Sequence, residues 1–127
     1  MVGIKSDVGV VRSLNEDYAG YIEEPRYRLY VVADGMGGHN AGEVASKIAV
    51  DTVKAYVRDN YENEGSSVLE NAVSFANSKI YESATSGSEY RGMGTTLVAA
   101  LISNGEIIIA NVGAVSYTHL TLPTNSR

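Results

Sequence analysis

Residues 27–39 constrain the fold more than any other part of the chain. Residues 27–33 are rich in aromatic and β-branched side chains, which predicts a β-strand whose apolar end is buried on both faces. This strand leads into Asp34 and then into a turn that contains three glycines, Gly35, Gly37 and Gly38. A strand that delivers a carboxylate onto such a turn places an oxygen ligand where backbone groups can also approach closely.

Two helices are predicted after this turn, because the hydrophobic period changes to that of a helix. Apolar residues recur at helical spacing between positions 41 and 60. A second helix is predicted from Ser67, which forms a capping-box pattern with Glu70. Residues 83–91 are polar and predict a loop.

Further strands are predicted on both sides of the helices. Residues 7–12 and 18–23 predict short strands before the apolar run, and residues 95–102 and 106–112 predict two more. An Asn-Gly pair at positions 104–105 joins the last two and is a strong hairpin signal. This order of strands, two helices and a hairpin indicates an α+β fold with antiparallel pairing, not alternating βαβ units.

Composition restricts the class of function. The 127 residues are enough for one domain, and the net charge of −5 disfavours nucleic acid as a partner. The absence of cysteine excludes disulfides and thiol chemistry. The first residues lack the pattern of a secretory signal, and no apolar stretch approaches a membrane span, so a cytoplasmic protein is expected.

Two acidic clusters predict a site for divalent cations and phosphate. Asp34 supplies a carboxylate and Gly35 a carbonyl oxygen, which are the ligands that Mg²⁺ and Mn²⁺ prefer, and a glycine leaves room for the ion. Glu16 and Asp17 form the second cluster. On a strand they would point to opposite faces, so one would be a direct ligand and the other would act through water. Arg12 has the planar donor fork that suits a phosphate.

Simpler interpretations stay open for these residues. Asp34 also fits a plain strand-to-helix turn, and adjacent carboxylates or a lone arginine are commonly solvated. His39 fits either a general acid beside the turn or a hydrogen bond at the helix entry. Residues 92–96 fit a phosphate-binding nest less well than close backbone packing at a strand start. A dinucleotide-binding turn is disfavoured because Asn40 stands where its third glycine would be.

Four motifs follow one another along the chain in a specific order and spacing. They are Arg12-Ser13-Leu14-Asn15-Glu16-Asp17, Val32-Ala33-Asp34-Gly35-Met36-Gly37-Gly38-His39, Ala41-Gly42-Glu43-Val44-Ala45-Ser46 and Gly92-Met93-Gly94-Thr95-Thr96. Together they resemble the bacterial branch of the metal-dependent type 2C serine/threonine protein phosphatases, from about residue 3 to Gly113. The resemblance implies a mostly antiparallel β-sandwich flanked by helices, a four-layer α-β-β-α fold, here truncated.

The same resemblance implies a binuclear Mn²⁺ or Mg²⁺ centre. Asp34 is expected to bridge the two ions, and the carbonyl of Gly35 is expected to bind one of them. Asp17 and Glu16 are expected to be outer or water-mediated ligands. The implied ligand set is incomplete in this chain.

The implied reaction is hydrolysis of phosphoserine and phosphothreonine by metal-activated water, without a phospho-enzyme. Arg12 is expected to hold the substrate phosphate, and His39 is the candidate general acid for the departing oxygen. Phosphorylated Ser/Thr proteins are the implied substrates. Bacterial Ser/Thr kinases and their substrates are the implied partners, and no nucleic-acid or membrane partner is expected.

The chain departs from the family pattern after Gly113. Ala114 stands where the family has an aspartate that binds an accessory third metal. Residues 1–113 are therefore interpreted as the N-terminal portion of a type 2C catalytic domain, and residues 114–127 as an unrelated, artefactual or disordered tail. With the family's later aspartates missing, little turnover is expected from this chain alone. The alternative is a non-catalytic binding or interaction module on a degenerate phosphatase fold.

Overall fold

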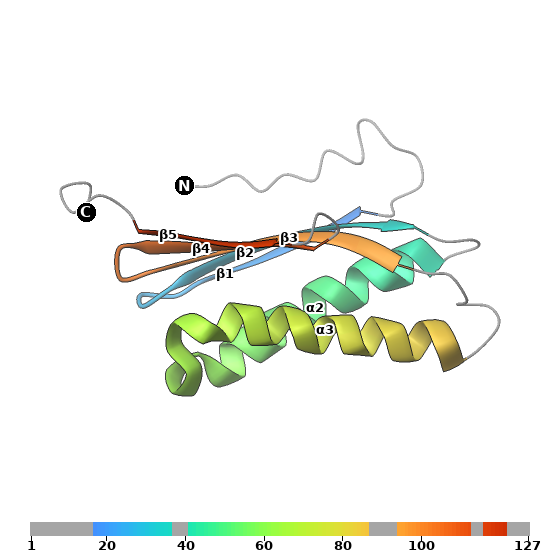
Figure 1. The fold of residues 1–127 in the computed structure, drawn as a ribbon, viewed down its shortest axis with the longest axis horizontal. Coiled ribbons are helices and arrows are strands. Elements are labelled where there is room, and N and C mark those ends of the chain that lie inside the picture. Colours follow the sequence, from blue (N-terminus) through green and yellow to red (C-terminus); the bar gives the residue numbers. More distant parts are fainter. Residues whose placement is uncertain (1–16, 37–40, 87–93, 113–115, 122–127) are drawn as a thin grey trace.

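The computed structural model describes residues 17–36, 41–86, 94–112 and 116–121, which form one sheet and one layer of helices (Figure 1). In chain order the elements are β1 (Asp17–Glu23), β2 (Arg28–Met36), α2 (Ala41–Glu64), the short 3₁₀ helix η1 (Gly65–Ser67), α3 (Val68–Ser86), β3 (Gly94–Ser103), β4 (Glu106–Val112) and β5 (Ser116–Thr121). The predicted strand at residues 7–12 lies outside the described residues. Within the described part of the chain, no helix is both long and apolar enough to cross a membrane.

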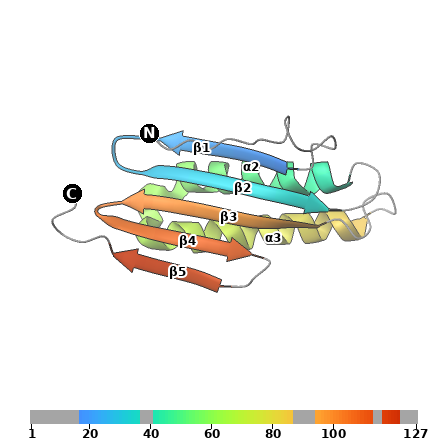
Figure 2. The ribbon, with the colours of Figure 1, turned by 90° about the horizontal axis from the view of Figure 1, so that it is seen from above.

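The five strands form an antiparallel sheet in the order β1-β2-β3-β4-β5, so neighbours in the chain are neighbours in the sheet (Figure 2). The predicted hairpin between β3 and β4 is confirmed. Its central residues Asn104 and Gly105 have φ angles of 52° and 76°, the positive values that a tight two-residue hairpin turn requires. The α+β class with antiparallel pairing is therefore confirmed, and the described residues contain one sheet of the expected sandwich.

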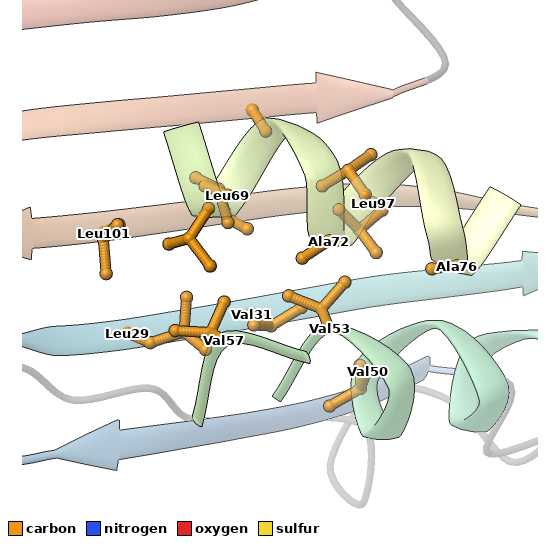
Figure 3. Packing of buried hydrophobic residues seen from close by; sticks show 14 of the residues in the cluster. Leu29, Val31, Val50, Val53, Val57, Leu69, Ala72, Ala76, Leu97 and Leu101 are labelled. Atoms are coloured by element: carbon orange, nitrogen blue, oxygen red, sulfur yellow. The ribbon is translucent and has the colours of Figure 1, made fainter. Parts of the chain in front are cut away.

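Both helices pack on the same face of the sheet (Figure 1). Alternate residues of the strands point toward them and interlock with the apolar stripes of α2 and α3 (Figure 3). Each fully buried leucine or valine stabilises the fold by about 1.5–3 kcal/mol relative to an exposed one. The largest of these fully buried apolar side chains are Leu29, Val31, Val50, Val53, Val57, Val68, Leu69 and Leu101.

The other face of the sheet carries no helix among the described residues. Val32 on β2 is 43% exposed there, and its cross-strand partner Val98 on β3 is 46% exposed. The prediction that the apolar end of residues 27–33 is buried on both faces was therefore wrong. An unbroken apolar run indicates an apolar environment on both sides of a strand, but it does not say whether both sides are covered within the same chain.

Several element boundaries differ from the expectation. β2 runs on to Met36, so Gly35, which was expected in the turn, lies in the strand. α3 continues to Ser86, so the predicted loop at residues 83–91 starts too early; residue propensity is a weak guide to where a helix ends. Ser116–Thr121 forms β5 against β4, inside the stretch interpreted as a tail. Because pairing to a sheet edge uses backbone groups of any sequence, this strand does not decide whether the stretch is unrelated, and the boundary after residue 113 stays a prediction.

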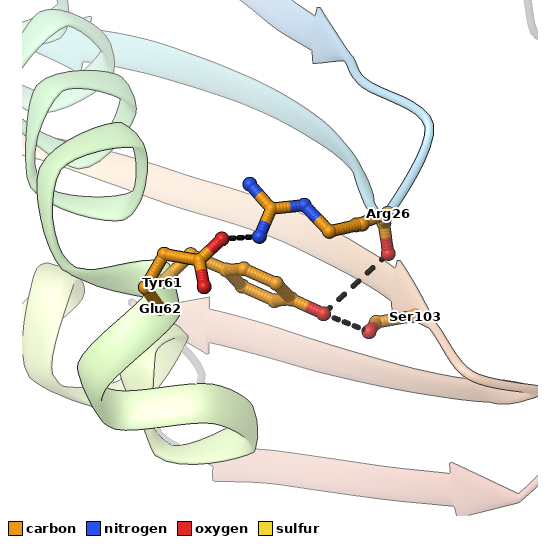
Figure 4. Close-up of polar contacts among 4 residues, drawn as sticks. All are labelled: Arg26, Tyr61, Glu62 and Ser103. Carbon is orange, nitrogen blue, oxygen red and sulfur yellow. Dashed lines mark hydrogen bonds and ion pairs between the residues drawn. The ribbon is translucent and has the colours of Figure 1, made fainter.

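One end of the helical layer is attached to two turns of the sheet (Figure 4). The hydroxyl of Tyr61 on α2 donates to the backbone oxygen of Arg26, 3.4 Å away, and shares a hydrogen bond with Oγ of Ser103. The Arg26 guanidinium lies 5.9 Å from the centre of the Tyr61 ring and pairs with Glu62. These contacts connect the β1–β2 and β3–β4 turns through α2.

Candidate functional site

Asp17 and Asp34 lie directly opposite each other on β1 and β2. Directly opposite residues of an antiparallel pair project from the same face, with Cβ atoms about 4.5–5.5 Å apart. For this pair it is the face that α2 and α3 leave uncovered, because Ala33 and Leu97, the neighbours of Asp34 and Thr96, point into the core. The structure therefore brings together two of the residues that the sequence singled out.

The turn between β1 and β2 fixes this register. The backbone N–H of Glu24 donates to the oxygen of Tyr27 at 2.8 Å, and Glu23 pairs with Arg28 at the first position of the ladder. Counting along the ladder from that pair brings Asp17 opposite Asp34. A slip of one residue would turn one carboxylate toward the helices, so the short turn determines the geometry of the acidic pair.

The acidic pair fits a hard divalent cation. Its two carboxylates supply oxygen donors side by side, and Oδ1 of Asp17 is buried. Two like charges this close repel each other, and burial removes the water that would screen them, so a cation between them would stabilise the arrangement. Among the described residues no group of three or more histidine, cysteine or acidic side chains converges, so further donors would come from other parts of the site.

Gly35 is required for a reason other than the one the sequence indicated. A Cβ built on it would lie 1.8 Å from the backbone oxygen of Gly42, in the first turn of α2. The missing side chain therefore lets the helix approach β2, on the face opposite the carboxylates, and does not make room for an ion. The expected reason was wrong, while the role of the Gly35 carbonyl as a ligand stays a prediction.

Thr96 extends the acidic pair across a third strand. It lies opposite Asp34 on β3, on the same face, and its Oγ1 donates to the backbone oxygen of Asp34 at 3.5 Å. The sequence reasoning assigned it no role, although it belongs to the glycine-rich segment 92–96. β3 starts at Gly94, one residue before the predicted start, but a Cβ there would meet only Cγ of Met36 at 3.9 Å, so close backbone packing does not explain this glycine.

Arg12, Glu16 and His39 lie outside the described residues. Their predicted roles in phosphate binding, metal binding and proton donation are therefore neither supported nor contradicted by the geometry. The structure describes the strand end and the helix start on either side of His39, at Met36 and Ala41.

The sequence matches the family model of Protein phosphatase 2C over residues 10–119. It is 40% identical over 114 residues to the serine/threonine phosphatase stp of Listeria innocua, an alignment that covers 86% of this chain and 45% of that protein. The chain thus spans about half the length of the curated relatives it matches.

Solved structures of bacterial serine/threonine phosphatases also match this chain, over about half of their own length. The serine/threonine phosphatase Stp1 from Staphylococcus aureus superposes with a TM-score of 0.68 at 37% identity, covering 89% of this chain and 49% of that one. The catalytic domain of the serine/threonine protein phosphatase PstP, solved in complex with two manganese ions, superposes with a TM-score of 0.66 at 32% identity, covering 88% of this chain and 50% of that one.

Proposed function

Because the chain belongs to the protein phosphatase 2C family, we propose that it carries one part of the metal centre of a bacterial phosphoserine/phosphothreonine protein phosphatase. The observation that supports this best is the pairing of Asp17 with Asp34 on one sheet face. These are two of the acidic residues whose motifs resemble the family, and the strand register places them side by side. The two manganese ions of the PstP structure support a binuclear centre.

In this proposal the acidic residues hold Mn²⁺ or Mg²⁺ from one side. Asp34 and Asp17 supply carboxylate oxygens, Glu16 supplies another directly or through water, and the Gly35 carbonyl supplies a neutral oxygen. Bound divalent cations lower the pKa of coordinated water and offset the charge of a phosphoryl group. The hydrogen bond from Thr96 to the backbone of Asp34 helps to hold that strand end in place.

Phosphate binding and proton donation in the proposed hydrolysis use Arg12 and His39. Arg12 orients the phosphate through paired hydrogen bonds from its guanidinium. Water releases one proton to the solvent and attacks phosphorus, the bond between phosphorus and the serine or threonine oxygen breaks, and protonated His39 gives its proton to that departing oxygen. The substrates are phosphorylated Ser/Thr proteins of the bacterial cytoplasm, including targets of Ser/Thr kinases.

Metal binding by the purified 127-residue chain tests the acidic pair without requiring activity. Free Mn²⁺ measured by electron paramagnetic resonance should fall on addition of the chain, and Asp34→Asn or Asp17→Asn should weaken binding by about tenfold or more, because each removes a charged donor. Asp51→Asn is the matched control, since Asp51 is an exposed aspartate on α2. Equal binding by all four proteins would contradict the proposal and favour a non-catalytic interaction module.

Activity is a separate measurement. The described residues bring two carboxylates together, and two carboxylates are too few ligands for two divalent ions. We therefore expect the chain alone to hydrolyse a phosphothreonine peptide slowly or not at all in the presence of Mn²⁺. Clear Mn²⁺-dependent turnover that disappears in Asp34→Ala would show that this part of the proposal is wrong. The same result would strengthen the assignment of Asp34.

A further inference from the structure

The helical layer has an outer side, which faces away from the sheet (Figure 1). Two hollows of about 470 and 410 Å³ follow one another there along the groove between α2 and α3, and Asp51, Thr52 and Lys79 line both of them. Within the described part of the chain, neither a strand nor a third helix covers this outer groove. It therefore lies open on the side of the sheet opposite the acidic pair.

The outer groove carries apolar side chains that the core does not use. Phe75 on α3 is 46% exposed, its ring lies 5.6 Å from that of Tyr56 on α2, and both line the larger hollow. Val44, Ile48 and Ala55 on α2 also line the hollows, and they recur at steps of four and seven residues. This spacing is typical of a helix that packs against another helix. An exposed aromatic ring beside an open hollow indicates a surface that packs against a partner.

The contacts between α2 and α3 define levels along the outer groove. The two helices run antiparallel, because only the short η1 joins them. Tyr56 meets Phe75 at one level, and Asp51 lines the hollows together with Lys79 about one turn further along. The ion pairs of the described residues involve neither Asp51 nor Lys79, and Nζ of Lys79 lies 5.4 Å from the centre of the Phe75 ring. Opposite charges thus stand on the two walls of the groove, beside an aromatic pair.

The area of this outer side is sufficient for a modest dimer. α3 has 19 residues and is roughly 28 Å long, and two adjacent helices are together roughly 20 Å wide. A contact between two copies would therefore bury roughly 1,100 Å² in total, which exceeds the roughly 1,000 Å² expected of a specific interface.

The arrangement of charges selects the symmetry of such a contact. A two-fold axis that runs along the groove places α2 of each copy over α3 of the other and leaves every residue at its own level. Asp51 of each copy then faces Lys79 of the other, and Tyr56 of each copy lies over Phe75 of the other. A surface with both signs of charge at one level is in this way complementary to itself.

Neighbouring charges favour the same arrangement. Lys47, which lines the smaller hollow, precedes Asp51 by one turn of α2. Glu82 follows Lys79 by about one turn of α3, so it stands at the level of Lys47 and faces that lysine of the other copy across the axis. A two-fold axis perpendicular to the helices would instead set α2 against α2 and bring Asp51 and Asp59 of one copy near the same carboxylates of the other.

We propose that two copies of this chain associate through the outer groove, as a four-helix contact with a two-fold axis along the groove. Phe75 of each copy fills the larger hollow of the other, and Asp51 pairs with Lys79 twice across the axis. The contact lies on the opposite side of the sheet from Asp17 and Asp34, so it leaves the candidate metal site open.

Sedimentation of the 127-residue chain tests this dimer, and the mass should rise with concentration from 13.5 kDa to twice that value. Phe75→Lys places a charge inside the contact and should weaken self-association by about 100-fold or more. Val98→Lys is the matched control, because Val98 is also 46% exposed but lies on the helix-free face of the sheet, and it should leave the dimer unchanged. Circular dichroism and thermal unfolding confirm that each variant is folded.

Three outcomes of these measurements would overturn the dimer. The first is a chain that stays monomeric at every concentration. The second is an effect of Val98→Lys as large as that of Phe75→Lys, because it would place the association on the sheet. The third is a species that keeps growing beyond two copies, since a contact with two-fold symmetry closes on itself.

A mixing experiment tests the orientation. Lys79→Glu or Asp51→Lys alone sets like charges against each other in both contacts of the dimer, and each should weaken self-association by about tenfold. An equimolar mixture of the two variants should recover most of the loss, because both contacts of the mixed dimer then join opposite charges. A repair within one copy cannot produce this recovery. Mixed variants that associate no better than each variant alone would overturn the placement of α2 over α3.

Discussion

The two faces of the sheet differ in what their residues do. On the helix-covered face, Leu29, Val31 and Leu101 are fully buried and belong to one continuous core. On the other face, alternate residues of the same strands include the acidic pair and the exposed valines Val32 and Val98. Consecutive residues of a strand therefore serve different purposes: one set stabilises the domain, and the other carries the candidate metal site.

The strongest test of this difference adds one methyl group to each face at the same end of the sheet. Gly35→Ala places a carbon 1.8 Å from the backbone oxygen of Gly42 and should destabilise the fold by about 3 kcal/mol or more, because backbone has to move. Gly94→Ala, whose new carbon would meet only Met36 Cγ at 3.9 Å, should change stability by less than about 0.5 kcal/mol. Urea unfolding measures both, and similar losses would contradict the assigned contact.

Neighbouring valines provide a second comparison. Val31→Ala removes buried methyl groups from the core and should lower the free energy of unfolding by about 2 kcal/mol. Val32→Ala, one residue further along β2 and 43% exposed, should cost about 0.5 kcal/mol. Both changes lose the same β-propensity, so their difference isolates burial. Urea unfolding measures both variants, and equal costs would mean that Val32 is as well covered as Val31.

Hydroxyl groups allow a third comparison. Tyr61→Phe removes the hydrogen bonds to Arg26 and Ser103 that attach α2 to two turns, and should cost about 1 kcal/mol. Tyr21→Phe removes a hydroxyl from a side chain that is 58% exposed on the helix-free face, and should be close to neutral. Thermal unfolding measures the two variants. A neutral Tyr61→Phe would show that ring packing, and not the hydroxyl, holds this end together.

The smallest effect concerns alkaline pH. Burial raises the pKa of Tyr27 above its usual value of 10.0, and the negative charge of Glu24 raises it further. A pKa raised by folding means that the stabilisation is complete below about pH 10 and is lost as pH rises through the folded-state pKa. Between roughly pH 9 and 11, Tyr27→Phe should therefore lose less stability than the unchanged protein. If the free energy of unfolding fell equally with pH in both proteins over this range, the raised pKa of Tyr27 would be contradicted.

The sequence was sufficient for most of the local structure. Apolar spacing predicted α2, the Asn104-Gly105 pair predicted the turn between β3 and β4, and residues 27–33 predicted the strand that leads into Asp34, although β2 continues to Met36. These features depend on short segments, in which side-chain period and backbone preference act directly. The last turn of α3 was missed, because residue propensity is a weak guide to where a helix ends.

The geometry of the candidate site depended on contacts between segments and was less predictable. That Asp17 stands opposite Asp34 follows from the register of two strands, which composition does not specify. The contact of Gly35 with Gly42 joins a strand to a helix, and no local pattern indicates it. The predicted roles of Arg12, Glu16 and His39 are untested because these residues lie outside the described ranges.

The ladder between Met36 and Gly94 has a consequence for the order of folding. The hairpin of β3 and β4 closes over two residues and can form within microseconds, whereas β2 meets β3 only after the whole helical pair between them has been spanned. Closing that longer loop costs more chain entropy, which prior formation of α2 and α3 would reduce by shortening the effective distance. The acidic pair itself needs only the short turn between β1 and β2, so Thr96 on β3 joins Asp34 later, when the longer loop closes.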